Sequence, residues 1–188
     1  MNETITSILK RRSVREYSTK AVAQTELDQI LEAGRNAPTA MNQQPWHFTV
    51  IRNPELRRKL EEQCKTAFLE SSNEALRDVA SQEGFSVFYQ APLLILVSAD
   101  RTALAPQYDS TLAMGNMMVA AASLGIGSCW THAAILFHAT TRGKDAYREL
   151  GIVLPEHHEL YAAAGFGYPS GGWPETPPKR ADCVTIME

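Results

Sequence analysis

The feature that most constrains the fold is an apolar run directly after Pro92, Leu93-Leu94-Ile95-Leu96-Val97. A strand with one face in water alternates apolar and polar residues, whereas a strand buried on both faces is apolar throughout. The run therefore predicts a central strand that is covered on both sides. A chain of 188 residues with 44% hydrophobic content is long enough to form such a core, and we expect a single domain over residues 1–188.

The other elements mix helices and strands. Apolar residues at helical spacing predict helices over about residues 4–12, 25–34, 109–124 and 140–150, and a further helix from Asn53-Pro54 onward. Residue types typical of strands occupy 47–51, 127–130 and 159–166, and strand-like alternation returns at 182–187 after an extended tail over 170–178. Because helices and strands do not alternate strictly, the pattern favours an α+β fold with a mixed or antiparallel central sheet flanked by helices.

Bulk properties disfavour several function classes. A net charge of -3 gives no electrostatic reason to expect a nucleic-acid or membrane partner. The first residues lack the apolar core of a secretory signal, and no apolar run approaches the roughly 20 residues that span a bilayer, so we expect a cytoplasmic protein. Cys64, Cys129 and Cys183 form no CxxC pair, and His157-His158 are adjacent in sequence. We therefore expect neither a disulfide nor a metal site.

Two glycine-containing segments could indicate a nucleotide-binding fold. Gly125-Ile126-Gly127 and Gly165-Phe166-Gly167 each lack the third glycine of a dinucleotide fingerprint, and no P-loop lysine follows either one. Pro169 would also interrupt the helix that should follow the second pattern. A Rossmann domain or a P-loop hydrolase is therefore disfavoured.

A cluster of basic residues lies near the N-terminus. Arg11, Arg12, Ser13 and Arg15 place three guanidiniums and a hydroxyl within five residues. Such donors suit a phosphate and the carbonyl edge of a polar ring. On composition alone, basic residues that complement the dipole of a helix end are an equal alternative.

The second motif is a loop rich in amides, which runs from Ala37-Pro38-Thr39-Ala40 through Asn42 and Gln44 to Pro45-Trp46. A polar turn before a strand explains its prolines but not the whole combination. In this order, the two motifs resemble the flavin-binding signature of the nitroreductase family, the small FMN-dependent NAD(P)H oxidoreductases. The resemblance implies the nitroreductase fold as an intertwined homodimer with one FMN at each of two interface sites.

The resemblance also assigns roles to the two motifs. Arg11, Arg12 and Ser13 would help to hold the flavin, and Arg15 would reach the pyrimidine carbonyl and N1 region of its ring. The late basic pair Lys179-Arg180 would complete the phosphate pocket. The loop would contact the flavin of the other subunit through Pro38, Thr39, Ala40, Asn42 and Gln44, with Thr39 and Ala40 standing where two serines are usual. Residues 170–188 would form an arm that packs on the partner.

Three further segments extend the resemblance. Gly125 to Trp130 resembles the family's Gly-Leu-Gly-x-Cys-Trp stretch, beyond which a main-chain amide approaches flavin N5. Near that amide the resemblance places Trp130, Thr131, His132 and Ala133, with His132 as a candidate for influencing the chemistry. Gly167-Tyr168-Pro169 resembles a later turn, and Asn73 lies near an asparagine that bonds the pyrimidine ring in relatives.

The family implies a reaction. NADH or NADPH would pass a hydride to flavin N5, and an electron-poor acceptor such as a nitroaromatic, quinone or enone would then collect the electrons. Two alternatives stay open. One is a flavoenzyme of the same fold with a dedicated substrate, such as a dehydrogenase, oxidase or dehalogenase. The other is a protein that stores or senses FMN without turnover.

Overall fold

The computed structural model describes residues 1–188 and contains one antiparallel sheet between two layers of helices. The strands are β1 (Trp46–Ile51), β2 (Leu93–Asp100), β3 (Gly127–Trp130) and β4 (His158–Gly167), in the order β1-β2-β4-β3. Every adjacent pair is antiparallel. The α+β fold with a helix-flanked sheet is therefore confirmed.

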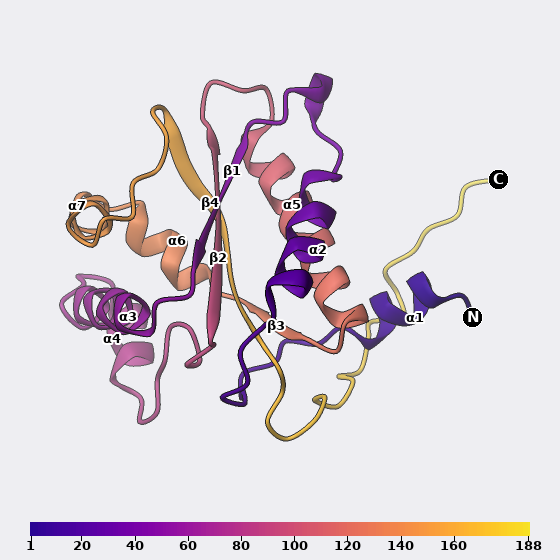
Figure 1. Cartoon of the computed structure of the whole chain (residues 1–188), viewed down its shortest axis with the longest axis horizontal. Helices are drawn as coiled ribbons and strands as arrows, with labels where there is room; N and C mark the ends of the chain where they lie inside the picture. The colour runs from indigo at the N-terminus through magenta and orange to yellow at the C-terminus, as the bar shows by residue number, and fades with distance from the viewer.

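Figure 1 shows the sheet nearly edge-on with helices on both sides. One layer holds α3 (Pro54–Leu69), α4 (Glu74–Ser81), α6 (His132–His138) and α7 (Thr141–Glu149). The other holds α2 (Gln24–Arg35) and α5 (Pro106–Ser123), with α1 (Glu3–Lys10) beside the end of α5. No helix has both the length and the apolar character needed to cross a membrane.

The central strand is β2, as its apolar run predicts. Leu94 and Leu96 lie in the core shared with α3, α6 and α7, whereas Leu93, Ile95 and Val97 lie in the core shared with α2 and α5. Each of these five side chains is at most 2% exposed. Because successive residues of a strand point to opposite faces, only an apolar residue at every position satisfies both cores.

Two helices were not predicted from the sequence. Helix α4 is short and polar, and it begins where the Asn73 side chain accepts a hydrogen bond from the Ala75 amide. Helix α6 follows β3 directly, and its N-cap residue, Thr131, makes no capping bond. Helix α2 begins at Gln24, one residue before the predicted range of 25–34, and Glu26 accepts a hydrogen bond from the Ala23 amide at this end.

The prediction of a strand over residues 182–187 is wrong for the single chain. These residues carry no regular structure, and Val184 and Ile186 are 75% and 80% exposed. A strand forms only against another strand, and no strand of this chain lies beside the tail. Figure 1 shows the tail leaving the end of β4 below the sheet and then running out on the side of α1, away from α4.

Gly127 offers a test of how closely the N-terminal segment must approach β3. A Cβ atom at Gly127 would lie 2.6 Å from Cγ2 of Val14, which is buried. We expect Gly127→Ala to lower the free energy of unfolding by about 1–3 kcal/mol, because neither backbone can move away without breaking hydrogen bonds. Urea titration measures the loss, and adding Val14→Ala should recover part of it. An unchanged urea midpoint in Gly127→Ala would contradict the close packing.

Candidate functional site

Backbone hydrogen bonds hold the segment from Ser13 to Ser18 between β3 and the end of β4. The Val14 amide donates to the Ser128 carbonyl at 3.0 Å, and the Ser18 amide donates to the Tyr168 carbonyl at 2.8 Å. Val14 is buried, so its neighbours Ser13 and Arg15 face the opposite way. The sheet therefore fixes the direction in which the arginine motif presents its side chains.

The arginine motif and the tail enclose a cavity of about 420 Å³. Its polar lining consists of Arg11, Arg12, Ser13, Arg15, Glu175 and Lys179. None of the four cations forms an ion pair, although Glu175 lines the same cavity. Clustered cations without carboxylate partners repel one another, so this cavity favours an anion.

The same region contains buried polar atoms without partners. The Nε of Arg12 and the Oγ of Ser128 are both buried and make no hydrogen bond. Other nitrogens of Arg12 are engaged: Nη1 donates to the Leu9 carbonyl at 2.6 Å, and Nη2 donates to the Thr176 hydroxyl. Arg12 thus ties the tail to the motif. A donor left unpaired in a buried place is costly unless a ligand accepts from it.

A second cavity, of about 310 Å³, adjoins Arg15. Its wall includes Tyr17, Gly84, Ser86, Tyr89 and Gln90. The Arg15 guanidinium lies 5.5 Å from the centre of the Tyr89 ring, and its interaction with the Tyr89 side chain raises the pKa of Arg15. Arg15 therefore remains a fixed cation at the junction of both cavities.

Sequence reasoning missed the segment over residues 84–91. Tyr89 and Gln90 have φ values of 53° and 54°, a conformation that residues other than glycine rarely adopt. Neither of these two positions is a glycine or an asparagine, so the sequence gives no signal for their conformation beyond the Ala91-Pro92 pair before the strand. Residues other than glycine with positive φ values often occur at functional sites.

Hydrogen bonds at the junction between β3 and α6 hold the segment over residues 84–91 in place. The buried Thr131 hydroxyl donates to the Val87 carbonyl at 2.8 Å, and the Thr131 amide donates to the Ala163 carbonyl at 2.9 Å. Trp130 and Ala133 are half-buried beside it, and His132 is exposed as the first residue of α6. The structure therefore links the predicted residues at the end of β3 to the wall of the Arg15 cavity.

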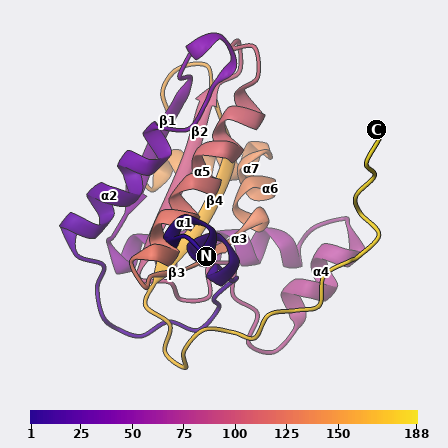
Figure 2. The same ribbon diagram turned by 90° about the vertical axis from the view of Figure 1, so that its right-hand side faces the viewer.

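The amide-rich loop lies at the other end of the molecule. Its Ala40 amide donates to Asp109 near the start of α5 at 3.2 Å, whereas the end of α5 leads into β3 and the arginine motif. Eighteen helical residues span about 27 Å. Both views agree, with the short helix η1 (Ala40–Asn42) at the top and β3 near the bottom (Figures 1 and 2). Within one chain, the loop and the arginines share no cavity.

The loop has a defined shape despite its exposure. Met41, Asn42 and Gln44 all have positive φ values, between 47° and 53°. The Thr39 hydroxyl accepts from the Gln44 amide at 3.2 Å, and the Gln44 side chain donates to Asn42 at 2.8 Å. Such strain persists only where surrounding contacts impose it, which makes the loop a second candidate segment for function.

The sequence profile described as the nitroreductase family matches residues 8–168. The chain belongs to the nitroreductase family. The resemblance inferred from the two motifs is thereby confirmed. The match spans the arginine motif, the amide-rich loop, the segment over 84–91 and the β3–α6 junction.

Individual relatives agree with this family. A Bacteroides fragilis nitroreductase, solved with bound FMN, is 34% identical over the whole of both chains with a TM-score of 0.91. An Archaeoglobus fulgidus protein, provisionally named as an NADH dehydrogenase/NAD(P)H nitroreductase, is 32% identical over 90% of this chain and 87% of its own length. An iodotyrosine deiodinase of Thermotoga neapolitana is 26% identical over 63% of this chain and 68% of its own.

Two of the residues predicted to bind the cofactor lie elsewhere in the structure. Asn73 caps α4 and lines none of the cavities around Arg15. Arg180 points to Asp182, with its Nε 3.5 Å from the carboxylate. Its neighbour Lys179 lines the cavity between the arginine motif and the tail. The two assignments rest on the family resemblance alone.

Proposed function

We propose that this FMN-dependent NAD(P)H oxidoreductase reduces electron-poor small molecules such as nitroaromatics, quinones and enones. The observation that carries the proposal is the cavity with four cations and no ion pair. When bound, FMN supplies the transfer of hydride from the nicotinamide to the acceptor. The protein supplies binding, orientation and a fixed electrostatic field.

The phosphate end of the cofactor fits the first cavity. Arg11, Arg12 and Lys179 face the cavity from the motif and from the tail, so they surround a phosphate from two directions. Guanidinium and ammonium donors to phosphate make charge-assisted hydrogen bonds, which are the strong ones. The unpaired Nε of Arg12 is one such donor.

The ring end fits the second cavity. Arg15 stands between the two cavities, and a cation there holds negative charge at the pyrimidine edge of a reduced ring. The wall formed by Ser86 and Gln90 adds hydrogen-bonding groups, and Tyr17 adds an aromatic face. His132 and Ala133, at the end of β3, remain our candidates for the main-chain contact to flavin N5.

Each complete site is built from two chains. The loop lies about the length of α5 from the arginine motif, so it reaches a flavin only in a second copy of the chain. A two-fold symmetric dimer brings the loop of each protomer to the motif of its partner. An interface on the α1 and α5 layer is supported by its exposed apolar residues. These are Ile5, Ile8, Leu9, Tyr108 and Leu112.

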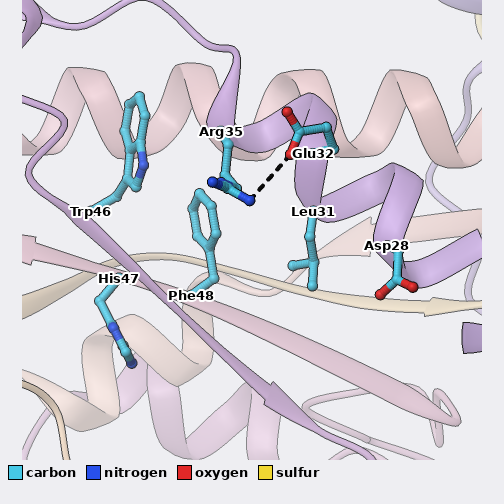
Figure 3. Close-up of a pocket in the computed structure, with 7 residues that line it drawn as sticks. All are labelled: Asp28, Leu31, Glu32, Arg35, Trp46, His47 and Phe48. Carbon is cyan, nitrogen blue, oxygen red and sulfur yellow. Dashed lines mark ion pairs between the residues drawn. The ribbon is translucent and has the colours of Figure 1, made fainter.

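The arm over residues 170–188 is suited to the same dimer. The edge of β3 is covered by Ser13 and Val14, but β1 is a free edge strand. A groove of about 580 Å³ runs between β1 and α2 (Figure 3), where Trp46 and Phe48 stack with ring centres 6.1 Å apart. We propose that Val184 and Ile186 of the partner arm pack in this groove as an added strand.

Reductive dehalogenation of an aromatic substrate is the second candidate function. The likeness to the Thermotoga neapolitana iodotyrosine deiodinase favours it over other dedicated substrates. Turnover separates these enzyme functions from storage of FMN: NAD(P)H bleaches the bound flavin of an oxidoreductase, and an acceptor restores its colour.

The cofactor assignment predicts that denatured protein releases FMN and not FAD. Lys179→Gln should weaken FMN binding about tenfold, because it removes one phosphate donor, whereas Arg180→Gln should leave binding unchanged. Chromatography identifies the chromophore, and fluorescence titration measures the affinity. Release of FAD alone, or equal effects of the two substitutions, would contradict the placement of the phosphate.

Arg15 should tune the flavin more than it stabilises the fold. A lost charge-assisted hydrogen bond of about 1.5–3 kcal/mol corresponds to a fall of roughly 30–65 mV in a two-electron potential. We expect Arg15→Ala to show this fall and Arg15→Lys to show less of it in a redox titration. A potential that does not move at full FMN occupancy would show that Arg15 lies away from the ring.

A further inference from the structure

A third cavity, of about 530 Å³, lies between α3 and the segment over residues 84–91. Gly84, Ser86 and Gln90 line both this cavity and the one around Arg15. The two cavities are therefore neighbours along the same short segment. A ligand that lies beside a flavin ring in the Arg15 cavity has a direct continuation toward α3.

The charges of the third cavity are not balanced. Helix α3 contributes Arg57, Arg58, Glu61, Glu62 and Lys65 to its wall. Arg58 is engaged by Glu62 and by Glu55, the latter at 2.7 Å. Glu61 accepts from the Val87 amide at 2.9 Å and from the Ser86 hydroxyl. Glu62 is thus paired with a cation, whereas Glu61 is hydrogen-bonded by neutral donors and forms no ion pair.

Two cations of this wall have no carboxylate partner. Arg57 donates only to the backbone carbonyl of Arg52, and burial without a countercharge lowers the pKa of Arg57. The Lys65 Nζ lies 5.9 Å from the centre of the Phe85 ring and forms no ion pair. An anion between them would restore the electrostatic stabilisation that burial removes.

The rest of the wall is suited to an aromatic ligand. Phe85 and Phe88 line the cavity together with Ala91. Ligand sites combine apolar surface with a few placed polar groups, and here those groups are cationic. An aromatic or heterocyclic body with one anionic substituent satisfies both parts of the wall.

We propose that this cavity is an anion subsite, in which Arg57 and Lys65 hold the carboxylate or phosphate of a ligand whose reacting end lies against the flavin ring placed at the Arg15 cavity. The inference rests on the proposed function, because it specifies a substrate of the same site. Two sources share this chemistry: an aromatic acceptor that carries a carboxylate, and the 2′-phosphate of NADPH. Arg57 and Lys65 then determine specificity and take no part in the chemistry.

The test compares charged and neutral ligands in the FMN-loaded protein. The double substitution Arg57→Gln, Lys65→Gln should raise KM for 4-nitrobenzoate about tenfold and leave KM for 4-nitrobenzamide and kcat unchanged. A second arm compares NADPH with NADH, and a rise confined to NADPH assigns the subsite to its 2′-phosphate. The matched control is Lys59→Gln on the same helix, since Lys59 lies outside the cavity and pairs with Glu55 at 3.6 Å.

The proposal would be overturned if the double variant changed KM equally for 4-nitrobenzoate and 4-nitrobenzamide and equally for NADPH and NADH. It would also be overturned if no KM changed. If the double variant fails to fold, the unaltered protein can be titrated with benzoate and with benzamide, and the flavin absorbance then reports the binding of each. Tighter binding of benzoate is the expected result, and equal binding would contradict it. If NAD(P)H does not reduce the flavin, the proposed function fails, while this titration still decides the anion subsite.

Discussion

The hydrogen bonds that join residues 13–18 to β3 and to the end of β4 are the constraint on which the site depends. Four cations lining one cavity repel each other, and a free chain end would let them separate into water. Here the Val14 and Ser18 amides are fixed at 3.0 Å and 2.8 Å from their acceptors, so the side chains cannot disperse. The folded protein thereby stores an electrostatic preference for an anion, and a ligand that binds only the folded state stabilises it.

Helix α5 determines how the two motifs relate. Its first turn anchors the amide-rich loop through Asp109, and its end continues through Ile126 into β3, to which the arginine motif is hydrogen-bonded. A rigid helix keeps these two groups apart within one chain, and the proposed symmetric dimer would bring them together. The proposed dimer would also give a role to the strained loop, the open edge of β1 and the unstructured arm.

The sequence was sufficient for the framework of the fold. The run from Leu93 to Val97 identified the central strand, because both cores require apolar residues at every position. The arginine motif was recognisable because its donors are contiguous in sequence. Local patterns of this kind carry their own physical signal.

Other features depend on contacts between distant residues. The pairing of Thr131 with Val87 and the left-handed backbone at Tyr89 are set by tertiary structure, so no local pattern revealed the wall over residues 84–91. Asn73 was assigned from approximate spacing, and its side chain caps α4 in this chain. For the arm, no strand within the chain can pair with the alternation over 182–187.

Complementation between two defective chains tests the two-chain site most directly. One chain carries Arg11→Ala and Arg15→Ala, and the other carries Asn42→Ala and Gln44→Ala, each with a different affinity tag. If every site combines the motif of one protomer with the loop of its partner, a purified heterodimer contains one intact site and one doubly defective site. The account predicts that heterodimers regain FMN and NAD(P)H-dependent bleaching that both parent homodimers lack. Heterodimers that bind no more FMN than their parents would show that each site is complete within one chain.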